Sequence, residues 1–426
     1  MKKFAVTILC LALSLSCFAT GTAEVPQTAS KPIVINYYDW DVPNQSFIDD
    51  FNREHPNIQV VVNIIPANAE RTTKLDILAM SGGDMDVMPI ADGDQFLRFE
   101  NGMLAPLDDF ITKDKFDMNA SFGKYAEWGI GSDGKYYGIP FRATQTMVWY
   151  NKTMFDQAGV PYPSDDWTYD EYIETSRKMA AWGKDKGIYG TYTHIYANEW
   201  ATVAGQVGKW FTSDNQPNIR DAAWIRALQI RKMLDDEGTQ MSFGQIKAVK
   251  AVINSTFLGG KTAMITAGSW LTRDMKNKEK FPFNFEVGVA YMPRFDESVT
   301  GKRSNFSCSI LGIPAKSEHK AEAWEFIKYY VQKASGAIAA SGNMPTYLPA
   351  YSDEIVEVFR KDSGLTAEYA AKFFAKEIQL TTNKILGPSG AKYMQIINDV
   401  VSLYFTGEIT LDKALTQIET RVKTEL

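Results

Sequence analysis

The stretch Gly134-Lys-Tyr-Tyr-Gly-Ile-Pro-Phe-Arg-Ala-Thr-Gln-Thr-Met-Val-Trp-Tyr-Asn-Lys152 decides the fold that we expect for this chain of 426 residues. It predicts an extended connector with one short strand on each side of Pro140, because a proline cannot donate to a central β-ladder and restricts the residue before it. The chain then restarts with Pro161, Pro163 and a new helix. This pattern is typical of a chain that leaves one lobe and enters another.

Three predicted strands lie upstream of this connector, with helical patterns between them. Residues 33–38, 58–65 and 86–91 are short apolar runs, and the β-branched run at 58–65 predicts a strand that is buried on both faces. Strands that alternate with helices predict an α/β sheet. Ligands of such sheets bind beyond the carboxyl ends of the strands, where four residues fall: Trp40, Asp41, Asp92 and Asp94.

The downstream half also carries local signals of helices and strands. Thr168 and Glu171 form a capping box that opens a helix, and a further helix is expected from Asp221 to Glu237. The run Phe257-Leu-Gly-Gly-Lys-Thr-Ala-Met-Ile-Thr-Ala-Gly-Ser-Trp270 predicts a helix end, a glycine turn and a strand. A phosphate-binding loop is excluded there, because its first glycine is replaced by serine and a strand follows where a helix is required.

The last third of the chain predicts two more strands, at 287–293 and 309–314, with a loop at 301–307 between them. A helix at 320–332 carries an apolar stripe, and the tail from Tyr351 is expected to be helical. Asn305 and Asn343 therefore fall on predicted loops.

The first 23 residues are interpreted as a targeting segment and not as part of the fold. Two lysines precede an apolar run at 4–15 that is too short to span a membrane. Two cleavage schemes stay open: a signal peptidase site at Gly21-Thr-Ala23, or lipid attachment at Cys17, which we favour because Ser14-Leu-Ser-Cys17 is similar to a loose lipobox. Residues 24–32 would form a flexible tether.

Composition argues against several classes of protein. The formal net charge is -6 and no run of Lys or Arg occurs, which disfavours nucleic acid as a partner. Only Cys308 follows the leader, so an exported domain must fold without an internal disulfide and needs a large apolar core. No later apolar run is long enough to cross a membrane, and we expect contact with a membrane only through the lipid anchor.

Tyr137-Gly-Ile-Pro140, followed by Tyr150-Asn-Lys152, resembles the first inter-lobe crossover of the family 1 extracellular solute-binding proteins. These are the carbohydrate-type receptors of ABC importers, related to maltodextrin-binding protein. Further segments match in the family's order and span the mature chain: Gly82-Gly-Asp-Met-Asp-Val87, Asn101-Gly-Met-Leu-Ala-Pro-Leu107, the run that ends at Trp270, and Gly342-Asn-Met-Pro345.

This resemblance implies an α/β, two-lobed periplasmic-binding-protein-like fold of type II, with a cleft between lobes that are joined by crossover segments. The expected lobes are residues 33–143 with 308–346, and residues 144–307 with 347–426. The resemblance also implies a periplasmic or cell-surface receptor, expected to be a monomer. Such a receptor binds a mono- or oligosaccharide by hinge closure and delivers it to an ABC permease.

A sugar presents hydroxyl groups and apolar C–H faces, so its receptor needs polar acceptors and flat aromatic platforms. Trp270 is the leading candidate, because it follows a strand and a glycine and matches the family's stacking position. Tyr393 is similar to a second stacking aromatic. Helix capping is the alternative role for each Asp, and core packing for each Trp. The predicted ligand-binding residues are Trp40, Asp41, Asp92, Asp94, Thr144, Glu199, Trp200, Trp270, Asn305 and Asn343.

Catalysis, a cofactor and a metal site are not expected. The three histidines form no metal-spaced pair, and no Gly-x-Ser-x-Gly motif occurs. Asp92 and Asp94 lie too close in sequence for the opposed pair of a glycosidase. Two rival interpretations stay open. One is the same fold binding a polyamine or an amino-acid-type solute, since aromatic boxes also suit cations, and the other is an extracytoplasmic glycan-processing enzyme.

Overall fold

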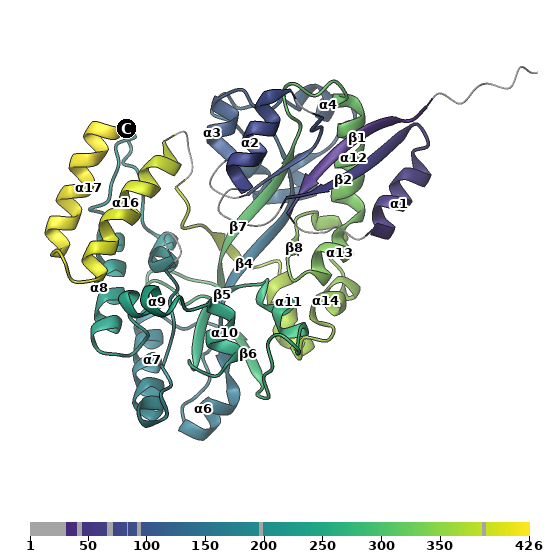
Figure 1. Ribbon diagram of the computed structural model, residues 1–426. Coiled ribbons are helices and arrows are strands. Elements are labelled where there is room, and N and C mark those ends of the chain that lie inside the picture. The colour runs from purple at the N-terminus through teal and green to yellow at the C-terminus, as the bar shows by residue number, and fades with distance from the viewer. Residues whose placement is uncertain are drawn as a thin grey trace, which may run out of the picture.

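The computed structural model describes residues 31–40, 45–65, 71–82, 84–91, 95–195, 199–385 and 389–426. Figure 1 shows two bodies, joined where strands β4 (Ile139–Asn151) and β7 (Arg303–Gly312) run from one into the other. The predicted two-lobed α/β architecture is confirmed. Four residues with predicted roles lie outside the described residues, and those roles stay predictions: Cys17, Asp41, Asp92 and Asp94.

The upper body in Figure 1 is built on a short parallel strand pair, β1 (Ile33–Asp39) with β2 (Ile58–Ile64). Strand β3 (Met88–Ile90) follows and pairs antiparallel with β7. The helices of this body are α1 (Gln45–Glu54), α2 (Arg71–Ser81), α3 (Gln95–Glu100), α4 (Asp108–Lys113), α12 (Lys320–Lys333) and α13 (Ser335–Ala340). The helix predicted at 320–332 is thus confirmed as α12, and it buries its apolar stripe.

Strand β2 differs from the prediction of a strand that is buried on both faces. Val60 is 4% exposed, whereas Val61 and Ile64 are 38% and 45% exposed. Among the described strands β2 pairs only with β1, so part of its surface stays in contact with solvent. A β-branched run indicates a strand, but it does not determine how many layers cover that strand.

Strand β4 is continuous over 13 residues, so the prediction of two strands separated at Pro140 is wrong. One edge of β4 pairs with β7 and then with β6 (Val287–Ala290). The other edge pairs with β8 (Met344–Pro345) and then with β5 (Met264–Gly268). Pro140 is tolerated because it lies near the start of the strand, beside a register shift between Pro140 and Arg142.

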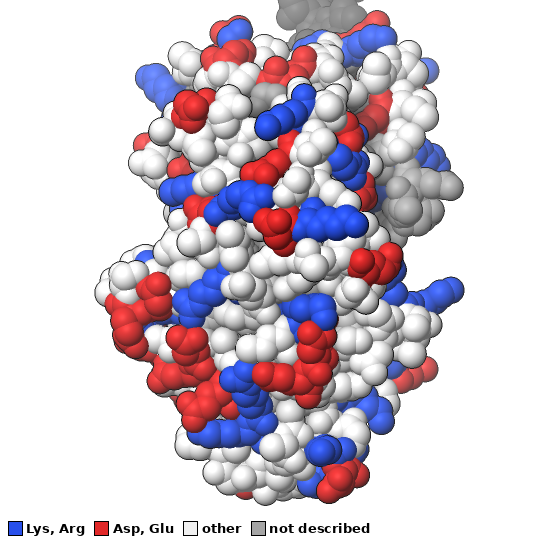
Figure 2. All heavy atoms as spheres, turned by 90° about the vertical axis from the view of Figure 1, so that its left-hand side faces the viewer, with Lys and Arg blue, Asp and Glu red and all other residues white. Residues whose placement is uncertain are grey.

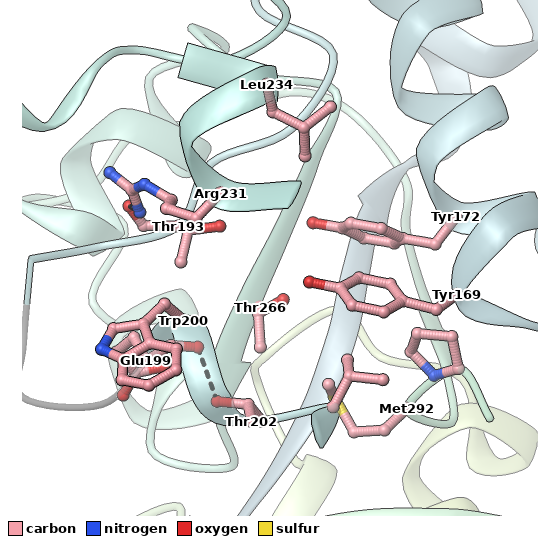
Figure 3. A pocket seen from close by; sticks show the side chains of 12 residues that line it. Tyr169, Tyr172, Thr193, Glu199, Trp200, Thr202, Arg231, Leu234, Thr266 and Met292 are labelled. Atoms are coloured by element: carbon pink, nitrogen blue, oxygen red, sulfur yellow. Dashed lines mark hydrogen bonds between the residues drawn. The ribbon is translucent and has the colours of Figure 1, made fainter. Parts of the chain in front are cut away.

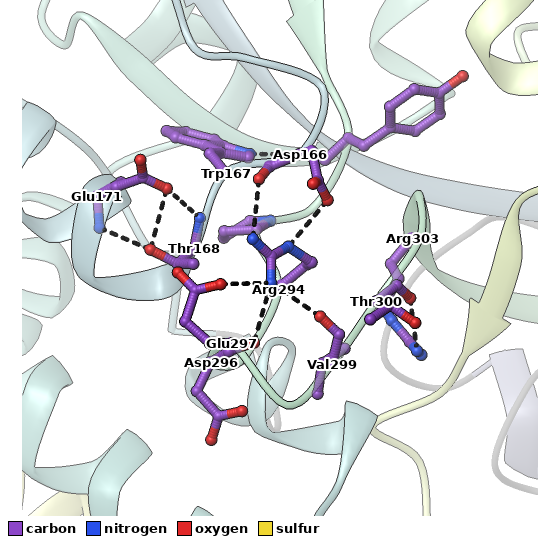
Figure 4. Close-up of polar contacts among 12 residues, drawn as sticks. Asp166, Trp167, Thr168, Glu171, Arg294, Asp296, Glu297, Val299, Thr300 and Arg303 are labelled. Carbon is purple, nitrogen blue, oxygen red and sulfur yellow. Dashed lines mark hydrogen bonds and ion pairs between the residues drawn. The ribbon is translucent and has the colours of Figure 1, made fainter.

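The lower body is mainly helical. Its helices are α6 (Lys152–Ala158), α7 (Tyr169–Gly183), α8 (Ala222–Asp236), α9 (Phe243–Val249), α10 (Ile253–Leu258), α16 (Gly390–Phe405) and α17 (Leu411–Glu425). The predicted capping box of Thr168 and Glu171 opens α7. Arg294, after β6, fixes the loop before α7: its Nε lies 2.9 Å from Asp166 Oδ1, and its Nη1 donates to the Val299 carbonyl at 2.9 Å (Figure 4).

The remaining elements are short. They are α5 (Met118–Phe122), α11 (Leu271–Lys276), α14 (Asp353–Arg360), α15 (Ala367–Ala371), β9 (Gln379–Thr381) and the 3-10 helices η1 (Gly123–Gly129), η2 (Lys184–Lys186), η3 (Glu199–Ala201), η4 (Ala204–Gln206), η5 (Leu348–Ala350) and η6 (Lys372–Phe374). Strand β9 pairs parallel with the start of β7, so the prediction that the tail from Tyr351 is helical is wrong for this segment. None of the helices in the described ranges is both long and apolar enough to cross a membrane.

The two faces of β4 belong to different hydrophobic cores. Met147 and Trp149 join the cluster that includes β1, α1 and α12, whereas Val148 and Tyr150 join the cluster of α7, α8 and α16. The surface is mixed in charge: acidic and basic side chains are interspersed over the face drawn in Figure 2. Because β4 runs from one body into the other, its middle lies where the two bodies meet (Figure 1).

Candidate functional site

Strand β4 and two of its neighbours, β5 and β7, belong to one sheet, and a group of mainly polar residues lies on one face of it. Side chains alternate along a strand, so Arg142, Thr144 and Thr146 share a face. Thr146 pairs with Asn305 of β7 on one edge and with Gly268 of β5 on the other. We call these five residues the crossover face. Thr144 and Thr146 are both partly exposed.

Trp270, Thr144 and Asn343 come together on the crossover face. A Cβ atom at Gly268 would lie 2.3 Å from Thr144 Cγ2 and 2.4 Å from Trp270 Nε1, so both side chains cover this glycine. The Thr144 hydroxyl donates to Asn343 Oδ1 at 3.5 Å, and Asn343 Nδ2 donates to Ser341 Oγ at 3.0 Å. Three residues predicted from separate segments thus form one cluster of an indole ring, a hydroxyl and an amide.

Trp40 contacts the crossover face at Arg142, whose guanidinium group lies over the Trp40 ring. The Cζ atoms of Arg71 and Arg142 lie 4.3 and 4.7 Å from the centroid of the Trp40 ring. Arg142 Nη2 also donates to Asp39 Oδ1 at 3.3 Å, and the Tyr37 hydroxyl donates to Asp39 Oδ2. Burial and the neighbouring Asp39 raise the pKa of Tyr37, so its phenol stays protonated as a donor. The sequence prediction leaves Arg142 out of the site, but this side chain connects Trp40 to the cluster.

Asn305 lies on strand β7 and not on the predicted loop. It pairs with Thr146 of β4 on one side and with Thr381 of β9 on the other. Its side chain is only 5% exposed, and Nδ2 has no hydrogen-bond partner among the described residues. The crossover face therefore contains a buried amide donor that no described residue satisfies.

Glu199 and Trp200 lie in the lower body, apart from this cluster. Figure 3 shows both residues at a small cavity, together with two tyrosines of α7 and with Thr266. Thr266 lies on the same face of β5 as Gly268, so the cavity is next to the crossover face. Its volume of about 20 Å³ has room for about one water molecule, not for a sugar ring.

Two aromatic side chains with predicted ligand contacts are part of the core of the lower body. Trp200 is 6% exposed and lies edge-on to Trp210 and Trp224, with ring centroids 6.1 and 6.3 Å apart. Core packing, the alternative role for Trp200, is what its surroundings show. Tyr393 is fully buried against Phe211 and Trp210, so its predicted stacking role is wrong.

A buried histidine lies beside this aromatic core. The Tyr192 hydroxyl is 2.6 Å from His194 Nδ1, and Arg231 Nη1 donates to the Thr193 carbonyl at 2.5 Å. Burial, together with the charge of Arg231, lowers the pKa of His194 to about 4, so this ring is neutral at pH 7. No group of three or more His, Cys, Asp or Glu side chains in the described ranges could hold a metal ion.

The model of one family, the bacterial extracellular solute-binding proteins, matches residues 42–337. This chain belongs to that family. The match covers β4, β5, β7 and thus the whole crossover face, and the resemblance inferred from the sequence motifs is confirmed. Members of this family and the neighbouring structures are binding proteins.

Named relatives and a solved structure agree with the family assignment. A mannitol-binding protein of Pseudomonas aeruginosa is 25% identical over 71% of this chain and 71% of its own length. A multiple sugar-binding protein of Streptococcus mutans is 24% identical over 73% of this chain and 74% of its own. The crystal structure of a sugar transporter from Rhizobium etli, in an open conformation, has a TM-score of 0.78 and 22% identity. It covers 92% of this chain and 100% of that one, and it shows the shared fold.

Proposed function

We propose that this protein is the carbohydrate receptor of an ABC importer and binds a mono- or oligosaccharide at the crossover face. The observation that carries the proposal is the cluster of Trp270, Thr144 and Asn343 beside Gly268. An indole ring suits the apolar face of a sugar, and the hydroxyl and amide suit its hydroxyl groups. The names of the mannitol-binding and multiple sugar-binding relatives support this class of ligand.

We further propose that the lobes are residues 33–143 with 308–346 and residues 144–307 with 347–426. These boundaries fall where Ala143 pairs with Cys308 and Thr144 pairs with Ser307, in the middle of the two long strands. A ligand that touches both lobes would favour the closed form through its higher affinity for that form. The closed receptor would then dock on the permease, and we expect the receptor itself to be a monomer without catalytic activity.

The surroundings of Trp40 favour a sugar over a polyamine. Two guanidinium groups already lie over this ring, and a further cation would be repelled by them. They also occupy space that a sugar face would need, so Trp270 is the better stacking platform. Among the described residues, Glu199 is the predicted acidic contact, and it lines the small cavity of the lower body.

A thermal-shift screen of the mature protein against mono-, di- and oligosaccharides tests the proposed ligand class, with polyamines and amino acids as comparison ligands. A ligand at a hundred times its Kd adds about 2.7 kcal/mol to the free energy of unfolding. Stabilisation by one class of sugar is the expected result. Stabilisation by a polyamine or an amino acid alone would contradict it, and turnover of an oligosaccharide would instead support a glycan-processing enzyme.

Export with a lipid anchor at Cys17 is a separate proposal, supported by the leader pattern. Mass spectrometry of the protein from its native membrane fraction should find an acylated amino terminus at Cys17. A free amino terminus at Glu24 would contradict this proposal and favour cleavage after Ala23.

A further inference from the structure

The face of β4 that points away from the crossover face borders a second cavity, of about 520 Å³. Gln145 lies at its floor, between Thr144 and Thr146 in sequence but on the opposite side of the strand. Phe122 and Tyr125, from α5 and η1, line one side, and Phe373 and Ile378, from the chain around η6, line another. Sites for small ligands commonly have volumes of roughly 300–1,000 Å³, so this space is large enough for one. We call it the hinge-back cavity.

The walls of the hinge-back cavity are apolar and rich in aromatic rings. Phe373 packs against Trp149 of β4, with ring centroids 5.5 Å apart, and Tyr125 packs against Phe306 of β7 at 5.5 Å. These contacts hold both walls on the same face of the crossover strands. The principal apolar side chains that line the space are Phe122, Leu348, Phe373, Phe374, Ile378 and Leu380.

One polar group at the floor of the cavity lacks a partner. Gln145 is 3% exposed, and its Nε2 donates to the Tyr125 hydroxyl at 3.3 Å. Its Oε1 is fully buried and has no hydrogen-bond partner among the described residues. A buried acceptor without a partner is costly, so a rotation of the Gln145 amide that turns Oε1 toward the cavity would let it accept a favourable hydrogen bond from a hydroxyl or N–H group of a ligand.

The charged residues that line the cavity are both lysines. Lys124 Nζ donates to the Leu380 carbonyl at 2.9 Å, which fixes this ammonium group across the cavity edge. Neither Lys124 nor Lys376 forms an ion pair with a carboxylate in the described part of the chain. The edge of an otherwise apolar space is therefore cationic and suits an anionic group.

We propose that the hinge-back cavity is a second ligand site, which takes a small apolar acid with an aromatic or branched body and one hydroxyl or N–H group. The apolar walls hold the body, Gln145 accepts the hydrogen bond, and Lys124 with Lys376 attracts the acid. The site is separate from the proposed sugar site, because it lies on the other face of β4.

Occupation of this site should alter sugar binding, an expectation that rests on the proposed function. The cavity is lined by residues of both proposed lobes, Phe122 from the first and Phe373 from the second. A rotation about β4 and β7 that closes the crossover face must move these walls relative to each other. A ligand between them therefore binds the open and closed forms with different affinity, and the two sites become coupled.

The fluorescent probe 8-anilino-1-naphthalenesulfonate tests the site, because it combines aromatic rings, an N–H group and an anionic group. We expect the mature protein to bind one probe molecule with increased fluorescence. Ala375→Trp, which fills the cavity, should weaken this binding at least tenfold. Trp270→Ala, beside the crossover face, should leave the Kd of the probe within twofold.

A second pair of variants tests the charge of the cavity edge without filling the space. Lys124→Met combined with Lys376→Met should weaken the probe several-fold and remove most of the salt dependence of its Kd. Lys423→Met, on α17, is the matched control and should have no effect. The uncharged analogue N-phenyl-1-naphthylamine should bind the wild type and the double variant equally.

The proposal is overturned if the probe does not bind, if Ala375→Trp leaves its Kd unchanged, or if Trp270→Ala abolishes its binding. Coupling is tested with a saturating sugar from the ligand screen. The sugar should change the Kd of the probe, and the probe should change the Kd of the sugar by the same factor. Unchanged Kd values overturn the coupling. Probe binding in a protein that binds no sugar would retain the second site and contradict the proposed function instead.

Discussion

In the middle of β4, at positions 144–147, the two faces differ in burial although they alternate residue by residue along one strand. Thr144 and Thr146 on the crossover face are partly exposed and polar. On the opposite face, Gln145 is 3% exposed, and Met147 and Trp149 are fully buried. Buried side chains contribute to the free energy of unfolding through packing, whereas exposed ones are free to contact a ligand. Substitutions on the buried face should therefore change mainly the free energy of unfolding, and substitutions on the crossover face should change mainly the affinity for the ligand.

The largest expected effect is the loss of stability on the buried face. Trp149→Ala removes a fully buried indole that donates from Nε1 to the Ala267 carbonyl at 2.9 Å. The free energy of unfolding should fall by about 3–5 kcal/mol, measured by urea denaturation. Thr146→Ala, three residues away on the crossover face, should cost less than about 1 kcal/mol. Equal losses for both variants would contradict the division between the faces.

Trp270→Ala should have the second-largest effect, on affinity and not on stability. Loss of an aromatic platform at the centre of a binding site costs roughly 2 kcal/mol or more, which is about a thirtyfold rise in the Kd of the sugar. Isothermal titration calorimetry measures this change. Trp182→Ala on α7 is the control, since this indole is also partly buried but lies under Lys186 and away from β4. An unchanged Kd for Trp270→Ala would place the sugar elsewhere.

Acid should destabilise the lower body without changing either face of β4. The pKa of His194 is about 4 in the folded protein, lowered by burial, against an ordinary value near 6.5 in the unfolded chain. The unfolded state thus takes up a proton first, so this contribution to stability is present above about pH 6.5 and is lost progressively as the pH falls towards 4. Urea midpoints measured at pH 7, 6 and 5 should decrease. The decrease should be smaller in His194→Gln, and an equal decrease in both proteins would rule out this cause.

The smallest expected effect comes from a single hydroxyl group. Thr144→Val keeps the shape of the side chain but removes the donor to Asn343, and should weaken sugar binding by about 1 kcal/mol, or roughly fivefold. Gln145→Met, at the adjacent position on the opposite face, should leave the Kd of the sugar within twofold. A larger effect from Gln145→Met than from Thr144→Val would reverse the assignment of the two faces.

Local signals in the sequence predicted many elements correctly. The capping box of Thr168 and Glu171 opens α7, and the glycine turn before 264–268 leads into β5, as predicted. These features depend on neighbours in the chain, such as a side-chain cap or a turn that needs a glycine. Trp270 was selected partly in this way, because it follows a strand and a glycine, and partly from the family resemblance; its role in ligand binding stays a prediction.

Features that depend on distant partners were not predictable in the same way. The continuity of β4 past Pro140 depends on pairing with β7 and β8, and the place of Asn305 in a strand depends on β9. Arg142 could be assigned to the site only once its contacts with Trp40 and Asp39 were known. The burial of Trp200 and Tyr393 likewise depends on distant residues: Trp200 packs on Trp224 of α8, and Tyr393 packs on Trp210 and Phe211.

The sequence by itself determined the class of fold, the order of most elements and the residues with suitable chemistry, because these follow from local spacing and composition. The tertiary structure decided which of those residues meet. Thr144, Trp270 and Asn343 form one cluster because β4, β5 and β8 are adjacent, whereas Trp200 packs into the core of the lower body. It also decided that Gln145 borders a cavity behind the strand, since a side chain's surroundings are set by elements that fold against it.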